Sequence, residues 1–319
     1  MPSDSRILLT LLAAAALFPL AVHDPYVLHI AILVLFYVVL ASSLNLIVGY
    51  VGEFSLGHTA FLGVGAYAAA LLAQKAGWPV WATIPAAGAL AAVAGGFIGA
   101  ITLRLKGPYF VIVTLSFAEV LRLIANNWIA VTNGPMGLAG IPQGFLQDKR
   151  LFFYAVLAVA AVTLYLCYRF VHSNAGRGAV AVRESRFVAQ SIGINPFGSA
   201  MLAFVLGAGL AGLAGGFYAH YITFVGPDIF QFSFMASMII MVLIGGKGTL
   251  IGPIIGAAIV TLLEEYLRDM QELRLTLFGL IVMAVVLFLP NGIISLTPKL
   301  KRLRPHAPAR PVSADRGVL

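Results

Sequence analysis

Charged residues are scarce in this 319-residue sequence: Asp, Glu, Lys and Arg make up 10% of it, whereas hydrophobic residues make up 61%. Soluble domains carry about 25% charged residues, so this composition excludes a soluble globular fold. Regular alternation of apolar and polar residues is also missing, which excludes a membrane β-barrel. The remaining class is an all-α, polytopic membrane bundle, because a helix satisfies its own backbone hydrogen bonds in lipid.

Cysteine is nearly absent as well. Cys167 is the one cysteine and lies in an apolar run, so an intrachain disulfide and a cysteine-based metal site are excluded; we expect no metal site. The nucleotide-binding pattern G-x-x-x-x-G-K-[ST] is also missing, because a glycine follows the lysine in GGKG (245–248). We therefore expect no cofactor on this chain, and any ATP must be bound by another polypeptide.

Apolar windows bounded by glycine, proline or charge predict about eight to ten transmembrane helices. Ten candidates cover residues 7–22, 26–48, 57–74, 79–103, 109–131, 151–171, 199–222, 230–246, 250–267 and 275–296. The first and the eighth are short for a bilayer that needs about 20 helical residues. The first can also be interpreted as a secretory signal, but FPLAVH (18–23) is a poor cleavage site and favours a retained span.

The distribution of Lys and Arg predicts the orientation of the chain. With ten spans and an inside N-terminus, inside segments hold fourteen of these residues and outside segments five, and Arg122 lies within a span. The positive-inside rule therefore predicts that both termini are cytoplasmic. We expect a single transmembrane domain over residues 1–298 and a basic, disordered cytoplasmic tail over 299–319.

Glycine is abundant, with 33 residues. The pairs Gly95/Gly99, Gly212/Gly216 and Gly252/Gly256 are small-xxx-small motifs, which predict close helix packing. Glycine and proline also cluster at two inner ends of spans, where we expect broken or re-entrant helices near 49–58 and 245–256. Broken helices in corresponding halves are typical of transporters, although the match between these two segments is loose.

The first of these clusters contains the stretch GEFSLGH (52–58), in which Glu53, Ser55 and His58 lie within six residues. One interpretation is an intramembrane hydrolase, with a serine nucleophile and a histidine base that Glu53 orients. The other is a turn at Gly52 and Gly57, in which Ser55 and His58 satisfy backbone groups freed by the helix break. We favour the second interpretation and assign no catalytic residue.

Span 109–131 carries polar residues on about a third of its circumference, among them Glu119 and Arg122, which are three residues apart and able to pair. Ionisable residues within a membrane usually face the bundle interior or water. Two interpretations stay open: a translocation path or hinge, and an ion pair that locks two helices.

The longest inside segment, 172–198, has helix-forming composition over Ala179–Ser191, with Gly193 as a terminator and Pro196 beyond it. A short amphipathic helix here either packs on lipid headgroups or docks a cytoplasmic partner. The residues that we assign to this coupling segment are Arg177, Arg183, Glu184, Ser185, Arg186 and Gly193.

Three motifs resemble those of one known family, in order and over most of the chain. They are NLIVGYVGEFSLGHTAFLGVGAY (45–67), GRGAVAVRESRFVAQSIGIN (176–195) with AFVLGAGLAGLAGGFYA (203–219), and PDIFQFSF (227–234) with MVLIGGKGTLIGPIIGA (241–257). The sequence is similar to permease subunits of bacterial ABC importers for branched-chain amino acids, of the LivM type. The widely shared importer pattern of Glu-Ala-Ala with a distant glycine is only partly kept at Glu184-Ser185 and Gly193.

The resemblance implies a multi-pass permease of the inner membrane that imports leucine, isoleucine or valine. It further implies a second permease of the LivH type, two cytoplasmic ATPase subunits that dock on the coupling segment, and a periplasmic or lipid-anchored binding protein. No nucleic-acid partner is expected. Gly52, Glu53, Ser55, Gly57, His58, Glu119 and Arg122 become candidates for the translocation path or hinge. Import of urea, short-chain amides or other amino acids, and a stand-alone secondary transporter, stay open as alternatives.

Overall fold

The computed structural model describes residues 2–270 except 23, 106, 145 and 146, together with 276, 279, 280, 283, 287 and 292–295. The described chain is almost entirely helical, which confirms the all-α class. The long or apolar helices are α1 (Pro2–Ala21), α2 (Pro25–Asn45), α3 (His58–Gln74), α4 (Val80–Thr102), α5 (Pro108–Asn127), α7 (Lys149–His172), α10 (Pro196–Ile222), α11 (Phe232–Gly245) and α12 (Gly252–Tyr266).

Short elements connect these helices. They are the π-helix η1 (Leu46–Val51), α6 (Ile129–Thr132), α8 (Asn174–Glu184), α9 (Arg186–Ser191), the 3-10 turns η2 (Gly134–Met136), η4 (Pro227–Phe230), η5 (Leu267–Met270) and η6 (Ile293–Ser295), and two strands, β1 (Leu138–Ala139) and β2 (Phe224–Val225). The strands pair antiparallel, with Leu138 opposite Val225. This pairing joins two loops that are far apart in the sequence.

Nine of the ten candidate spans coincide with a helix of the structure. Five helices in the described part of the chain are long and apolar enough to cross a membrane: Pro25–Val51, α4, α5, α7 and α10. The eighth candidate is indeed a short helix, α11, with 14 residues. The tenth candidate, 275–296, lies largely outside the described residues, and the expected tail, 299–319, lies entirely outside them.

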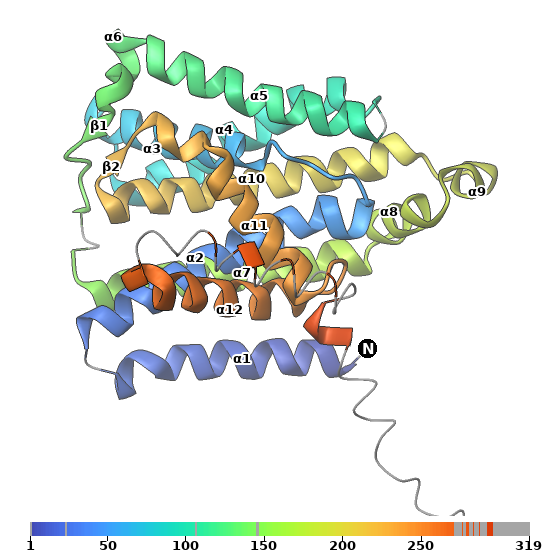
Figure 1. Ribbon diagram of the computed structural model, residues 1–319, viewed down its shortest axis with the longest axis horizontal. Coiled ribbons are helices and arrows are strands. Elements are labelled where there is room, and N and C mark those ends of the chain that lie inside the picture. The colour runs from blue at the N-terminus through green and yellow to red at the C-terminus, as the bar shows by residue number, and fades with distance from the viewer. Residues whose placement is uncertain are drawn as a thin grey trace, which may run out of the picture.

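The helices lie side by side in a bundle, with α5 and α1 on opposite edges and α10 between them (Figure 1). The chain start, α8 and α9 lie at one end, which we call the α8–α9 end, and the two strands lie at the other, the β1–β2 end. Trp78, Trp81 and Trp128, at or beside the ends of α3, α4 and α5 nearest the strands, are all exposed. This placement fits the interfacial anchors that tryptophan provides.

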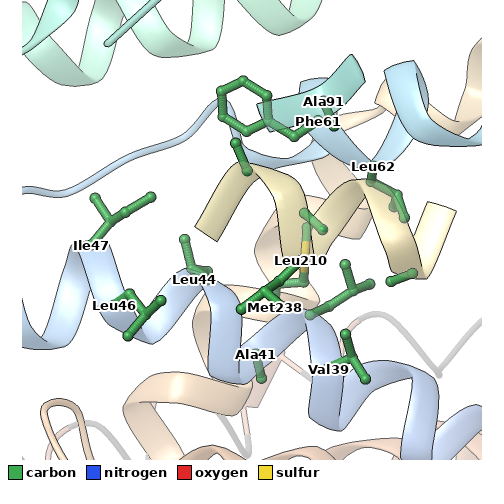
Figure 2. Close-up of a cluster of buried hydrophobic side chains, with 14 of the residues drawn as sticks. Val39, Ala41, Leu44, Leu46, Ile47, Phe61, Leu62, Ala91, Leu210 and Met238 are labelled. Atoms are coloured by element: carbon green, nitrogen blue, oxygen red, sulfur yellow. The ribbon is translucent and has the colours of Figure 1, made fainter. Parts of the chain in front are cut away.

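Small residues allow α10 to touch α3 and α4 closely. A Cβ added to Gly212 of α10 would lie 2.2 Å from the Cβ of Ala91, and one added to Gly65 of α3 would lie 2.2 Å from the Gly212 carbonyl oxygen. Lipid tails are as apolar as the side chains, so close packing rather than water exclusion holds such helices together. Figure 2 shows part of the resulting core, which includes Phe61 and Leu62 of α3 and Leu210 of α10.

One expectation about this fold is wrong in detail. The coupling segment is two helices, α8 and α9, rather than one helix over Ala179–Ser191. Ser185 separates them in an extended conformation, and its Oγ accepts a hydrogen bond from the Val188 backbone N–H at 3.4 Å. A serine hydroxyl competes well for the free N–H groups of a helix start, so Ser185 begins a new helix instead of continuing the old one.

Candidate functional site

The stretch GEFSLGH begins where α2 changes into the π-helix η1. The Gly52 N–H donates to the Ile47 carbonyl oxygen at 3.0 Å, and Gly52 then ends the helix with φ at +85°. Residues 52–57 are not helical, and α3 starts at His58. The expected helix break is therefore present. π-Turns are rare and frequently lie at functional sites.

His58 is fully buried beneath this break. Its Nε2 lies 2.8 Å from the Ser43 Oγ, and the Ser43 hydroxyl also lies 2.8 Å from the Leu40 carbonyl oxygen. Since a hydroxyl has a single proton and the carbonyl can only accept, Ser43 donates to Leu40 and His58 Nε2–H donates to Ser43. The His58 ring also meets Phe61 edge to face, at 6.0 Å between centroids.

This geometry contradicts the hydrolase interpretation. Ser55 is buried, and neither its Oγ nor His58 Nδ1 has a hydrogen-bond partner in the described part of the chain. Ser55 is therefore not hydrogen-bonded to the base that would activate it, and Glu53 does not hold the imidazole through Nδ1. The expectation that Ser55 and His58 satisfy freed backbone groups is also wrong. His58 bonds to the Ser43 side chain, and the Ser55 Oγ has no hydrogen-bond partner among the described residues.

The second glycine cluster meets the first. The turn of residues 246–251, between α11 and α12, lies against η1, where the Asn45 Nδ2 donates to the Thr249 carbonyl oxygen at 2.8 Å. The Gly248 N–H donates to the Asn45 Oδ1 at 2.9 Å. One amide side chain thus joins the two helix breaks, which are about two hundred residues apart in the sequence. We call Asn45, η1 and residues 246–251 the break junction.

The loop of residues 52–57 is also tied to the inner side of α5. The Leu56 N–H donates to the Thr114 Oγ1 at 3.2 Å, and a Cβ on Gly57 would lie 2.3 Å from the Thr114 carbonyl oxygen. Gly57 therefore permits a close approach of this loop to α5. The loop is held between α5 and the break junction.

Arg183 of the coupling segment reaches into the break junction. Its Nη1 donates to the Gly49 carbonyl oxygen at 2.6 Å, and its Nη2 pairs with the neighbouring Glu184 at 2.7 Å. The other predicted coupling residues stay local. The Arg177 Nη2 donates to the Asn174 Oδ1 at 2.5 Å, and Gly193 follows α9 with φ at +82°.

α9 exposes apolar side chains beyond the bundle. Phe187 is 82% exposed and Ile192 68%, and Val188 between them is exposed as well. Arg186 and Gln190 lie on the same short helix. An apolar patch with polar residues around it, on a segment that projects from the bundle (Figure 1), is typical of a protein-protein contact.

Glu119 and Arg122 form the expected ion pair, but away from the break junction. The Arg122 Nη2 lies 2.6 Å from the Glu119 Oε1, and their side chains are 33% and 50% exposed respectively. Among the five long helices, α5 has the smallest share of buried residues in its most apolar stretch. The pair therefore lies on an outer face of the bundle, and its two members bond to each other within α5.

The comparisons with known proteins agree with the motifs. The family described as "Branched-chain amino acid transport system / permease component" matches residues 26–289. The chain belongs to this family. That match covers every helix from α2 to α12, the break junction and the coupling segment, so the geometry described above lies within the family's shared region.

Two of its relatives are LivM proteins, the high-affinity branched-chain amino acid transport system permeases of Escherichia coli and Salmonella typhimurium. They are 32% and 31% identical to this chain, over 92% of it and 76% of their own length. The LivH permease of Escherichia coli, from a system with the same description, is 23% identical over 81% of this chain and 91% of its own. No solved structure gave a significant match.

Sequence reasoning missed Ser43, Asn45, Thr114 and Thr249 as parts of this site. A signal for the first two was present: LASSLN (40–45) places three polar side chains in an otherwise apolar span. Polar residues within a span face the bundle interior, where they bond to other helices. Their partners, however, lie on segments far away in the sequence and were not predictable from it.

Proposed function

We propose that this chain is a permease subunit of an ATP-driven ABC importer that carries leucine, isoleucine and valine across the bacterial inner membrane. The observation that carries the proposal is the family match over residues 26–289, together with 32% identity to a LivM permease. The multi-pass helical bundle supports it. Both termini lie in the cytoplasm, and separate subunits bind and hydrolyse ATP, since the sequence has no nucleotide-binding loop pattern.

The ATPase subunits contact the α8–α9 end. Support comes from the exposed apolar residues Phe187, Val188 and Ile192, which neither the bundle nor a neighbouring element covers. With the N-terminus inside, this end is cytoplasmic by the distribution of Lys and Arg. α9 then presents its apolar side chains to a groove on an ATPase subunit.

A second, homologous permease covers the outer face of α5. A half-exposed ion pair within a span is costly against lipid, because lipid offers neither hydrogen bonds nor solvation. A neighbouring permease or the water-filled path between two permeases supplies both. The similarity of this chain to both LivM and LivH supports a pair of unlike permeases.

The binding protein approaches the β1–β2 end. The loop of residues 132–143 and the segment 226–232, both of which the sequence places outside, are brought together there by the β1–β2 pairing. Met136 is exposed in the first, and Phe232 at the edge of the second. The binding protein then contacts both segments at once.

The decisive experiment reconstitutes the chain with a second permease, two ATPases and a binding protein from its own genome in proteoliposomes, and measures uptake of labelled leucine. We expect uptake that requires ATP and that excess isoleucine or valine suppresses. Uptake of urea or a short-chain amide, with leucine ignored, would contradict the substrate. Transport by this chain alone without ATP would instead indicate a secondary transporter.

ATPase docking has a separate test. The double variant Phe187→Ser, Ile192→Ser removes the apolar patch of α9, and we expect the ATPase subunits to be lost on purification of the complex. Met136→Ser is the control, because it removes an equally exposed apolar side chain at the opposite end. Unchanged ATPase recovery in the double variant would contradict docking on α9.

A further inference from the structure

We propose that Arg183 is a positioning residue of the transport cycle, which transmits displacement of the α8–α9 segment to both helix breaks at once. The inference rests on the proposed function, because it assumes that ATPase subunits move this segment. It goes beyond that function by naming a residue that bonds the segment to the helix breaks. It also gives Arg183 a contact within this chain, at the break junction, in addition to its place in the coupling segment.

Arg183 binds the end of a helix. The helix of α2 and η1 ends at Gly52, so the carbonyl groups of its last turn have no helical partner. The Gly49 carbonyl is one of them and accepts from the Arg183 Nη1 at 2.6 Å. The end of a helix also carries partial negative charge, which a guanidinium complements. Arg183 therefore caps the C-terminus of α2 and η1 with a charge-assisted hydrogen bond.

Two glycines provide the space that the Arg183 side chain occupies. A Cβ on Gly52 would lie 2.5 Å from the Arg183 Cγ, and one on Gly248 would lie 2.7 Å from the Arg183 Nη1. The stem of Arg183 thus lies across one helix break and its head against the other. Each break provides a glycine where any side chain would displace the arginine. We call the space between Gly52 and Gly248 the slot; it accommodates the extended Arg183 side chain, which enters from α8.

Displacement of Arg183 acts on more than one helix. Asn45 bonds both to the Thr249 carbonyl and to the Gly248 N–H, so η1 and the turn between α11 and α12 are connected to each other. A force on Gly49 therefore also acts on α11 and α12. Packed elements shift between discrete arrangements rather than deforming continuously, so one link at the junction moves several helices. α8 itself packs on α10, η1 and α7. Arg183 adds a hydrogen bond to the contact with η1 and lies against Gly248 of the second break.

The pairing with Glu184 adds orientation. The Arg183 Nε and Nη2 both donate to the Glu184 Oε1, at 3.2 and 2.7 Å, which leaves Nη1 directed at Gly49. Glu184 is the last residue of α8, next to the Ser185 break. Glu184 therefore moves together with Arg183 when α8 is displaced, and keeps the guanidinium oriented.

The test uses the complete importer in proteoliposomes and measures leucine uptake and ATP hydrolysis in the same samples. In Arg183→Ala we expect the ATPase subunits to remain bound and hydrolysis to stay within about twofold of the parent. We expect uptake to fall by about tenfold or more, so the number of leucines moved per ATP falls in proportion. Arg169→Ala, which removes an exposed cation from the end of α7, is the charge-matched control.

A second variant reaches the same link without touching Arg183. Gly248→Ala places a methyl group against Nη1 and should give the same uncoupling, and adding Arg183→Ala should make it no worse. Gly77→Ala controls for backbone strain, because Gly77 also has a positive φ, +67° against +73°, with nothing within 4 Å of its added Cβ. It should transport like the parent.

Two outcomes would overturn the proposal: parental uptake in Arg183→Ala, or a proportional fall of uptake and hydrolysis with loss of the ATPase subunits. The second would mean that Arg183 acts in docking or assembly. If the proposed function itself is wrong, the parental complex shows no ATP-driven leucine uptake, which is a different result from an uncoupled variant.

The variant Arg183→Lys can reach Gly49 but cannot also bind Glu184 through a fork. It should recover part of the lost uptake.

Discussion

The side chain of Asn45 holds residues that are about two hundred positions away: it donates to the Thr249 carbonyl oxygen at 2.8 Å and accepts from the Gly248 N–H at 2.9 Å. Both helix breaks of the bundle thus depend on one amide. This relationship means that the two glycine-rich motifs form a single structural unit. Variants at either motif should therefore affect the other.

Asn45→Ala leaves a backbone donor and a backbone acceptor without their partner in a largely buried region. Leaving such groups unsatisfied costs about 1–3 kcal/mol each, so we expect a clear loss of thermal stability in detergent. Asn127→Ala is the control, because Asn127 is exposed and its Nδ2 donates to the Leu123 carbonyl oxygen of its own helix. Equal melting temperatures for the two variants would contradict the role of Asn45.

His58→Ala should impair assembly, because the imidazole is fully buried and donates to Ser43. Large-to-small changes at buried positions cost about 2–5 kcal/mol. His58→Gln retains a donor near the Nε2 position and should recover part of the folded protein, measured by size-exclusion chromatography. Normal assembly of His58→Ala with lost uptake would instead favour a side chain that lines the path.

Glu119→Ala should reduce uptake by several-fold, since it leaves the Arg122 charge on an outer face of α5 without its partner. The pair is partly exposed, so we expect little change in the stability of the chain itself. Val120→Ala, at an exposed neighbouring position, is the control, and exchange of the two charges should recover part of the uptake. Full transport by Glu119→Ala in an intact complex would contradict a role in the path or the permease contact.

Gly212→Ala tests the packing of α10 on α4. The added methyl would lie 2.2 Å from the Ala91 Cβ, and overpacking of this kind costs about 1–3 kcal/mol. Gly96→Ala is a matched control on α4, where the nearest atom would lie 3.8 Å away. Alanine favours a helix over glycine by about 1 kcal/mol, so Gly96→Ala should be neutral or stabilising in thermal unfolding. The prediction fails if the two variants melt alike.

Local sequence patterns were sufficient for the helices and their ends. Nine candidate spans match helices, and both glycine clusters mark breaks, because hydrophobic length and missing side chains act within a few residues of where they stand. The error at Ser185 has a local cause as well. Its capping bond to Val188 outweighs the helix-forming composition around it, and composition alone does not weigh such a bond.

For the candidate site, the sequence predicted residues but not their partners. Glu53, Ser55 and His58 are close in sequence and suggested a hydrolytic site. In the structure, however, His58 is hydrogen-bonded to Ser43 and not to Ser55. Arg183, which we assigned to the coupling segment, also binds Gly49. Such choices depend on how α2, α8, α10 and the turn before α12 pack, because a side chain bonds to whatever group the packing brings within about 3 Å.

The sequence by itself determined that this protein is a helical membrane permease, where its helices break, and to which family it belongs. These properties follow from composition, apolar length and motifs that are read along the chain. The tertiary structure alone decided that the two breaks meet at Asn45, that Arg183 lies in a slot between them, and that the Glu119–Arg122 pair faces outward. These contacts join distant segments, and helix packing through small residues brings those segments together.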